Sequence, residues 1–148
     1  IMSQADLLFG GHHSKAKSHI RNLIRIACAD GTFDDTEWEL LIRIARKFEL
    51  SEEEVKDVMN HIDDYSFTPP ANKEDRNVQL YNLGRMVMAD GVQDKEEMVK
   101  INRFAIGLGY SGDCVHELVD NVIEMINKGL PSDEAMDAIQ KFVDNHKE

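Results

Sequence analysis

The chain has 148 residues, a length typical of one domain, and its 28 Asp and Glu outnumber 17 Lys and Arg for a formal charge of −11. This excess argues against a nucleic-acid-binding protein, which needs basic surface to meet phosphates. The two cysteines, Cys28 and Cys114, make a disulfide framework unexpected and favour a reducing, cytoplasmic location. No run of about 18 uncharged apolar residues is present, so we expect no membrane span.

The charge is unevenly placed along the chain. Residues 1–48 carry 7 basic and 6 acidic side chains, whereas residues 49–148 carry 10 basic and 22 acidic ones. Residues 1–19 form a basic, partly ordered lead-in, and the basic character extends to Arg25. Two interpretations of this stretch stay open: a patch that meets an acidic partner or an anionic lipid surface, or the solvated start of a helix.

Apolar residues recur at helical spacing in seven segments, which predicts seven amphipathic helices and an all-α fold. The segments lie at 20–27, 38–48, 55–62, 80–87, 98–108, 115–126 and 135–143.

Local chemistry predicts where several helices begin and end. Ser51 with Glu54 three residues later forms a capping box, and Ser132 is expected to be an N-cap. Gly109 and Gly129 lie where helix-ending glycines occur. Residues 66–70, with two consecutive prolines, break the pattern and divide the chain into two halves.

The two halves resemble each other in sequence. A shift of 60 residues aligns 20–59 with 80–119, and 12 of the 40 aligned pairs are identical. This internal repeat predicts a single domain over 20–148, built from two pseudo-symmetric three-helix halves and a C-terminal helix. The densest identities form the turn Ala-Asp-Gly-x-x-Asp-x-x-Glu, at 29–37 and again at 89–97.

The repeated turn has a structural interpretation. Gly31 and Gly91 would end one helix with positive φ, and the second Asp and the Glu would form a capping box on the next. The first Asp of each copy fits less well, because a carboxylate at a helix C-terminus faces the negative end of the helix dipole. The structural interpretation therefore leaves Asp30 and Asp90 without a role.

The same turn also has a chemical interpretation. Each copy offers three carboxylates, and hard cations such as calcium or magnesium prefer oxygen ligands. If the two turns converge, six carboxylates would share one surface, which would either raise some of their pKa values or recruit a cation. The spacing differs from an EF-hand, and nearby arginines are an alternative source of neutralisation. The candidate metal ligands are Asp30, Asp34, Glu37, Asp90, Asp94 and Glu97.

This duplicated Ala-Asp-Gly turn, placed between amphipathic helices, resembles the TerB family of tellurite-resistance proteins and the related domain of DnaJ-like co-chaperones. The resemblance spans about residues 20–145. It implies a TerB-like helical bundle, a bacterial cytoplasmic setting, peripheral membrane association through partners, and a role in stress responses. It also implies a divalent metal at Asp30, Glu37, Asp90 and Glu97.

A second constellation is the His116-Glu117-x-x-Asp120 segment, which is similar to a zinc-binding helix motif with Asp in place of the second His. No third ligand is identifiable, and a solvated helix face explains it. No catalytic residue and no organic cofactor are indicated.

We therefore expect a non-enzymatic stress-response protein that docks protein partners through an acidic, cation-binding surface. The alternatives are a purely structural interaction or co-chaperone attachment module without metal and, third, a metal-dependent hydrolase.

Overall fold

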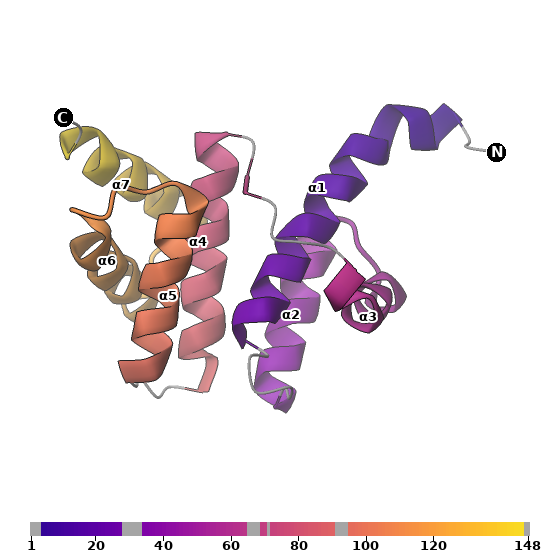
Figure 1. Cartoon of the computed structure of the whole chain (residues 1–148), viewed down its shortest axis with the longest axis horizontal. Coiled ribbons are helices and arrows are strands. Elements are labelled where there is room, and N and C mark those ends of the chain that lie inside the picture. The colour runs from indigo at the N-terminus through magenta and orange to yellow at the C-terminus, as the bar shows by residue number, and fades with distance from the viewer. Residues whose placement is uncertain (1–3, 28–33, 65–68, 71, 91–94, 147–148) are drawn as a thin grey trace. The chain divides into compact units, whose positions relative to one another are not determined.

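The structure is a computed structural model that describes residues 4–27, 34–64, 69–70, 72–90 and 95–146. Over these residues the chain is helical and contains no strand, which confirms the predicted all-α class and its seven helices (Figure 1). The helices are α1 (Gln4–Ala27), α2 (Asp35–Lys47), α3 (Glu52–Asn60), α4 (Lys73–Val87), α5 (Lys95–Leu108), α6 (Val115–Asn127) and α7 (Ser132–Asn145). Two short 3-10 segments, η1 (Ile62–Asp64) and η2 (Met88–Asp90), follow α3 and α4.

The chain divides into two compact units, unit 1 (Ile1–Thr68) and unit 2 (Pro69–Glu148). The boundary lies within the predicted breaker at 66–70, where consecutive prolines remove backbone donors and restrict φ. In unit 1, α1, α2 and α3 pack on one another, and in unit 2, α4 packs on α5, α6 and α7. Each unit therefore has a helical core of its own.

The core of unit 1 follows the apolar spacing of the sequence. Ile20 and Leu23 of α1 and Leu41 of α2 are all 0% exposed. Full burial of such a side chain stabilises a fold by about 1.5–3 kcal/mol, so these positions hold the helices together. Helix α1 begins at Gln4, so most of the expected lead-in at 1–19 belongs to the first helix.

The starts of α3 and α7 test the capping predictions. The Glu54 amide donates to Ser51 Oγ at 3.2 Å and the Ser51 amide donates to Glu54 Oε1 at 3.1 Å, so the predicted capping box is confirmed. At α7 the prediction was wrong by one position, because Ser132 is the first helical residue and Pro131 is the N-cap. Pro131 has φ −58° and makes no side-chain hydrogen bond to the helix. Its ring instead fixes φ at the start of the helix.

Three helices end with a residue in the left-handed region. Gly109 after α5 and Gly129 after α6 have φ of 110° and 70°, as predicted for helix-ending glycines. After α2 the same role falls to Glu49, with φ 65°. The Glu49 amide and the amide that follows it donate to the carbonyls of Arg46 and Ala45, each at 3.0 Å, which is a Schellman motif.

Helix α4 packs against all three other helices of unit 2 and is buried on several sides. In the last turn of α4, Gly84 allows α6 to approach closely. A Cβ added at Gly84 would lie 2.7 Å from Ile126 Cδ1 and 3.3 Å from Val122 Cγ1. A larger side chain at this position would therefore collide with α6.

A chain of polar side chains links α4, α7 and the turn after α5. Tyr110 Oη donates to Asn77 Oδ1 at 2.6 Å, and Asn77 Nδ2 donates to Gln140 Oε1 at 2.8 Å. Gln140 Nε2 in turn donates to Asp144 Oδ1 at 2.9 Å. Burial raises the pKa of Tyr110, so its hydroxyl stays a donor, and the buried amide of Asn77 is satisfied on both its oxygen and its nitrogen.

Two pairs of equivalent helix boundaries in the two units fall 60 residues apart. Helices α1 and α4 end at Ala27 and Val87, and α2 and α5 begin at Asp35 and Lys95. Across the described ranges, none of the helices is long and apolar enough to cross a lipid bilayer.

Candidate functional site

The first acidic turn leads into α2 through Asp34 and Glu37. Asp34 is the N-cap, with φ −83° and ψ 171°, and its Oδ1 accepts from the Glu37 amide at 2.8 Å. Glu37 Oε1 accepts from the Asp34 amide at 3.3 Å, which completes the predicted capping box. Such a cap contributes about 1 kcal/mol, so these two carboxylates have a sufficient structural role.

The second acidic turn is described only in part. Glu97 lies in the first turn of α5 and is half-buried. Asp94 lies outside the described residues, and for Asp90 only the backbone, at the end of η2, is described. The prediction that Asp94 and Glu97 form a second capping box therefore stays a prediction.

The other predictions for the first turn concern residues outside the described ranges. Neither Asp30, the candidate ligand that capping explains least, nor Gly31, the expected helix-ending glycine, is described. A convergence of the two turns, which a site shared by six carboxylates would require, stays a hypothesis.

By themselves, the described carboxylates of the first turn offer few oxygen ligands for a cation. Asp34 Oδ1 and Glu37 Oε1 each accept a backbone hydrogen bond, and a calcium ion takes 6–8 oxygen ligands. Among the residues whose side chains are described, no group of three or more His, Cys, Asp or Glu is arranged to hold a metal ion. The donor chemistry suits a hard cation, but a site here would need Asp30 in addition to Asp34 and Glu37.

The His116-Glu117-x-x-Asp120 segment lies on the exposed face of α6. All three side chains are exposed, whereas Leu118 between them is 0% exposed. Glu117 Oε2 lies 3.6 Å from His146 Nε2, so this glutamate pairs with the end of α7. Within the described part of the chain the segment gathers no set of metal ligands.

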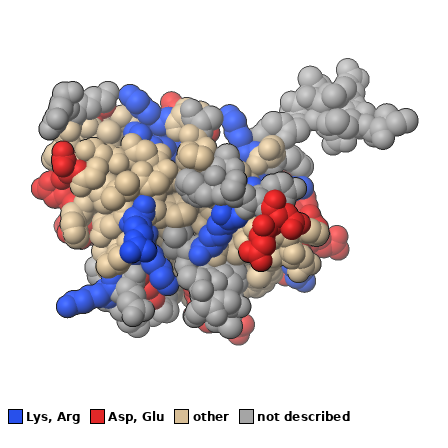
Figure 2. All heavy atoms as spheres, viewed as in Figure 1, with Lys and Arg blue, Asp and Glu red and all other residues tan. Residues whose placement is uncertain are grey.

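An acidic run at α3 and η1 lies outside the repeated turns. Residues 49–64 carry seven acidic side chains and one lysine, and all but one of the acidic side chains are exposed. Figure 2 shows acidic side chains together on this part of unit 1. Local charge counted over a short window would have found the run. We call these residues the α3 acidic surface: Glu49, Glu52, Glu53, Glu54, Asp57, Asp63 and Asp64.

Besides Lys56, a histidine lies among these carboxylates. His61 Nδ1 is 2.9 Å from the Asp57 carbonyl oxygen and 3.3 Å from Asp57 Oδ1. The hydrogen bond to that carbonyl, then the Asp57 carboxylate, and more weakly Asp64, raise the pKa of His61. The surface therefore combines fixed negative charge with a histidine whose pKa is raised by its acidic surroundings.

Comparison with known protein families gives a match within the first half of the chain. Residues 9–60 match the family described as tellurite resistance protein TerB. We call residues 9–60 the TerB-like region because they are similar to that family. The TerB-like region runs from within α1 to the end of α3, includes the turn at 29–37, and stops before the turn at 89–97. The predicted resemblance is thus confirmed for the first copy of the repeat.

Searches of curated proteins and of solved structures gave no match.

Proposed function

We propose that this chain is a non-enzymatic, tellurite-resistance-like stress-response protein that docks partner proteins through its α3 acidic surface. The observation that carries the proposal is the position of this surface: it begins at the end of α2, covers α3, and so lies largely inside the TerB-like region. Exposed like charges repel one another and cost stability, so such a cluster favours a role in recognition. A basic patch on a protein partner is its natural complement.

The docking proposal is tested by neutralising the surface. We choose Glu53→Gln with Asp63→Asn, two exposed carboxylates, and as matched control Glu134→Gln with Asp137→Asn on exposed positions of α7. Bacteria that lack their own copy are complemented with each variant and grown with tellurite, and proteins that copurify from the same cells are compared. We expect loss of protection and of the copurifying partner only for the α3 variant, and equal behaviour of both variants would contradict the proposal.

The cation component of the proposal concerns the repeated turn. We propose that calcium or magnesium binds through Asp30, Asp34 and Glu37, with Asp90, Asp94 and Glu97 as the equivalent set. Carboxylate chemistry and the TerB-like character of the first copy support it. A bound cation would offset the repulsion that neighbouring carboxylates exert on each other.

Calorimetric titration with calcium, magnesium, manganese and zinc tests this component. Glu37→Gln keeps the capping geometry but removes a charge, and Glu54→Gln makes the same change in the capping box of α3. We expect Glu37→Gln to weaken cation binding about tenfold and Glu54→Gln to leave it unchanged. Absence of heat together with an unchanged melting temperature would contradict cation binding and leave docking intact.

The capping box itself favours a second candidate function. Because Asp34 and Glu37 are accounted for as a helix cap, the turn can also belong to a purely structural interaction or co-chaperone attachment module without metal. In that case chelation of divalent cations would leave the melting temperature unchanged, whereas the cation component predicts that chelation lowers it.

A further inference from the structure

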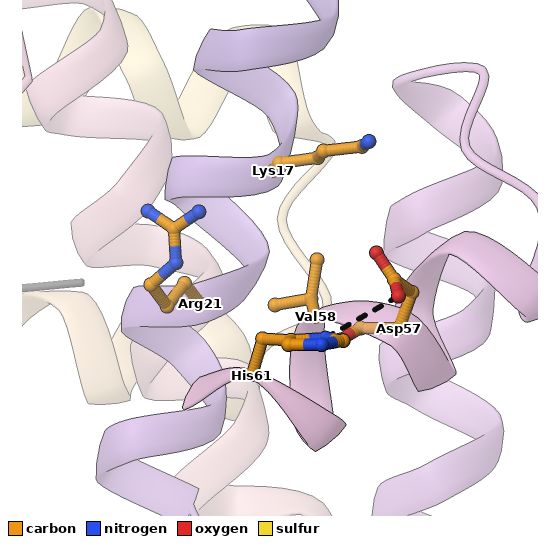
Figure 3. Close-up of a pocket in the computed structure, with 5 residues that line it drawn as sticks. All are labelled: Lys17, Arg21, Asp57, Val58 and His61. Atoms are coloured by element: carbon orange, nitrogen blue, oxygen red, sulfur yellow. Dashed lines mark hydrogen bonds and ion pairs between the residues drawn. The ribbon is translucent and has the colours of Figure 1, made fainter. Parts of the chain in front are cut away.

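A small cavity in unit 1 lies between α1 and α3 (Figure 3). Lys17 and Arg21 line it from α1, and Asp57, Val58 and His61 line it from α3 and the residue that follows α3. Its volume is about 210 Å³, which is room for about seven water molecules. The space therefore suits a small polar ligand and is too small for a folded partner.

The lining of the cavity is mainly cationic although α3 is acidic. Lys17 and Arg21 are four residues apart, so they share one face of α1. In Figure 3 the Lys17 ammonium lies toward Asp57, and the Arg21 guanidinium lies on the other side of His61. The lining thus contains two fixed cations and one carboxylate, and the imidazole adds a further positive charge when it is protonated.

We propose that this cavity binds a small free oxyanion of the phosphate class, with Lys17 and Arg21 as charge partners and His61 as an additional donor. Arg presents a planar fork that matches oxyanion geometry, and Lys supplies a compact ammonium donor. Val58, which is 5% exposed, provides an apolar wall. The site is separate from the cation turns and shares Asp57 with the α3 acidic surface.

His61 makes the affinity of this site pH-dependent. Asp57 and, more weakly, Asp64 favour its charged form, whereas the cations of Lys17 and Arg21 line the same cavity and disfavour it. A bound anion also favours the charged imidazole, by linkage. Affinity should therefore rise as the pH falls through the pKa of His61, provided that the anion itself does not titrate.

The experiment is a titration of the ¹⁵N-labelled full chain with sodium sulfate, followed by amide chemical shifts at constant ionic strength. Sulfate keeps its charge between about pH 5.5 and pH 7.5, so changes in affinity report the protein. We expect saturable shifts at amides around the cavity, with a Kd on the order of 1 mM because the charged side chains are partly exposed. Inorganic phosphate at fixed pH should displace sulfate from the same amides.

Three variants test which residues act. Lys17→Gln should weaken sulfate binding about 5–10-fold, whereas Lys141→Gln, at an exposed lysine of α7, should change it less than about twofold. His61→Gln should retain weak binding but lose the increase in affinity at lower pH. Far-UV circular dichroism checks that each variant is folded. Shifts that do not saturate, or equal effects of Lys17→Gln and Lys141→Gln, would overturn the proposal.

Discussion

Unit 1 and unit 2 use positions 60 residues apart in different ways. His19 of α1 is 5% exposed and Gln79 of α4 is 4% exposed, so one buried polar position holds a titratable group and the other does not. Ile24 packs in the core of unit 1 at 4% exposure, whereas Gly84 makes room for α6. The shared spacing determines which positions face the core of each unit. The neighbouring helices determine which side chain can occupy such a position.

The largest expected effect comes from acid. Burial lowers the pKa of His19 to about 3, against about 6.5 in an unfolded chain. Between these values the unfolded state binds more protons, so the free energy of unfolding falls as the pH falls from about 6.5 to about 3, by roughly 4–5 kcal/mol in total. The single tryptophan, Trp38, lies in α2 of unit 1, so its fluorescence during urea unfolding at several pH values measures this loss.

The control for this prediction introduces the unit 2 residue into unit 1. His19→Gln should flatten the pH dependence between about pH 6.5 and pH 4 even if it lowers stability at neutral pH. His116→Gln, at an exposed histidine of α6, should leave the slope unchanged. An unaltered slope in His19→Gln would mean that carboxylates cause the acid sensitivity.

Exchanging the residues of the pair Ile24 and Gly84 should also lower the free energy of unfolding. Gly84→Ile places the unit 1 side chain where even a Cβ would lie 2.7 Å from Ile126 Cδ1, so we expect a loss of about 3 kcal/mol. Ile24→Val, which only shortens a side chain, should cost about 1 kcal/mol. Denaturant unfolding followed by circular dichroism measures both. A loss below about 1 kcal/mol for Gly84→Ile would show that α6 can move away from α4.

Two serines in equivalent positions give a smaller contrast. Ser51 caps α3, so Ser51→Ala should destabilise by about 1 kcal/mol. Ser111 precedes α6, whose N-cap is Cys114 without a side-chain cap, so Ser111→Ala should cost less than about 0.5 kcal/mol. Thermal unfolding of both variants measures the difference, and equal losses would contradict the assigned caps.

The smallest effect is a gain in stability at the end of α2. Glu49 is exposed and has φ 65°, so Glu49→Gly should relieve strain and stabilise by about 0.5–1 kcal/mol. Gly109→Ala, at the equivalent position with φ 110°, should destabilise by about 1 kcal/mol. Melting temperatures that move in the same direction for both changes would contradict this comparison.

Local patterns predicted most of the fold. Helical spacing, the Ser51 and Asp34 caps and the glycines at 109 and 129 act within a few residues, so sequence alone was sufficient for them. Pro131 in place of Ser132 shows that a preset φ can serve where a side-chain cap is expected.

Features that depend on distant residues could not be predicted. The cavity joins Lys17 to His61, and the close approach at Gly84 depends on α6. Neither contact has a signature in local spacing, because each needs the packing of two helices that are separated in the chain. For the repeated turns, the sequence identified the candidate carboxylates. Whether they form one cation site depends on the positions of Asp30 and Asp90.

The polar chain from Tyr110 to Asp144 has a consequence for synthesis of the protein. Asn77 lies near the start of α4, but its amide nitrogen donates to Gln140, 63 residues later. On the ribosome, α4 therefore emerges before the partner of the Asn77 amide, which is buried in the folded chain, has been made. Helices α1, α2 and α3 can already pack at that stage. Unit 2 can complete its core only when α7 leaves the exit tunnel. Slow translation or stalling before residue 140 would therefore expose the polar face of α4 to chaperones and leave the packing of unit 1 intact.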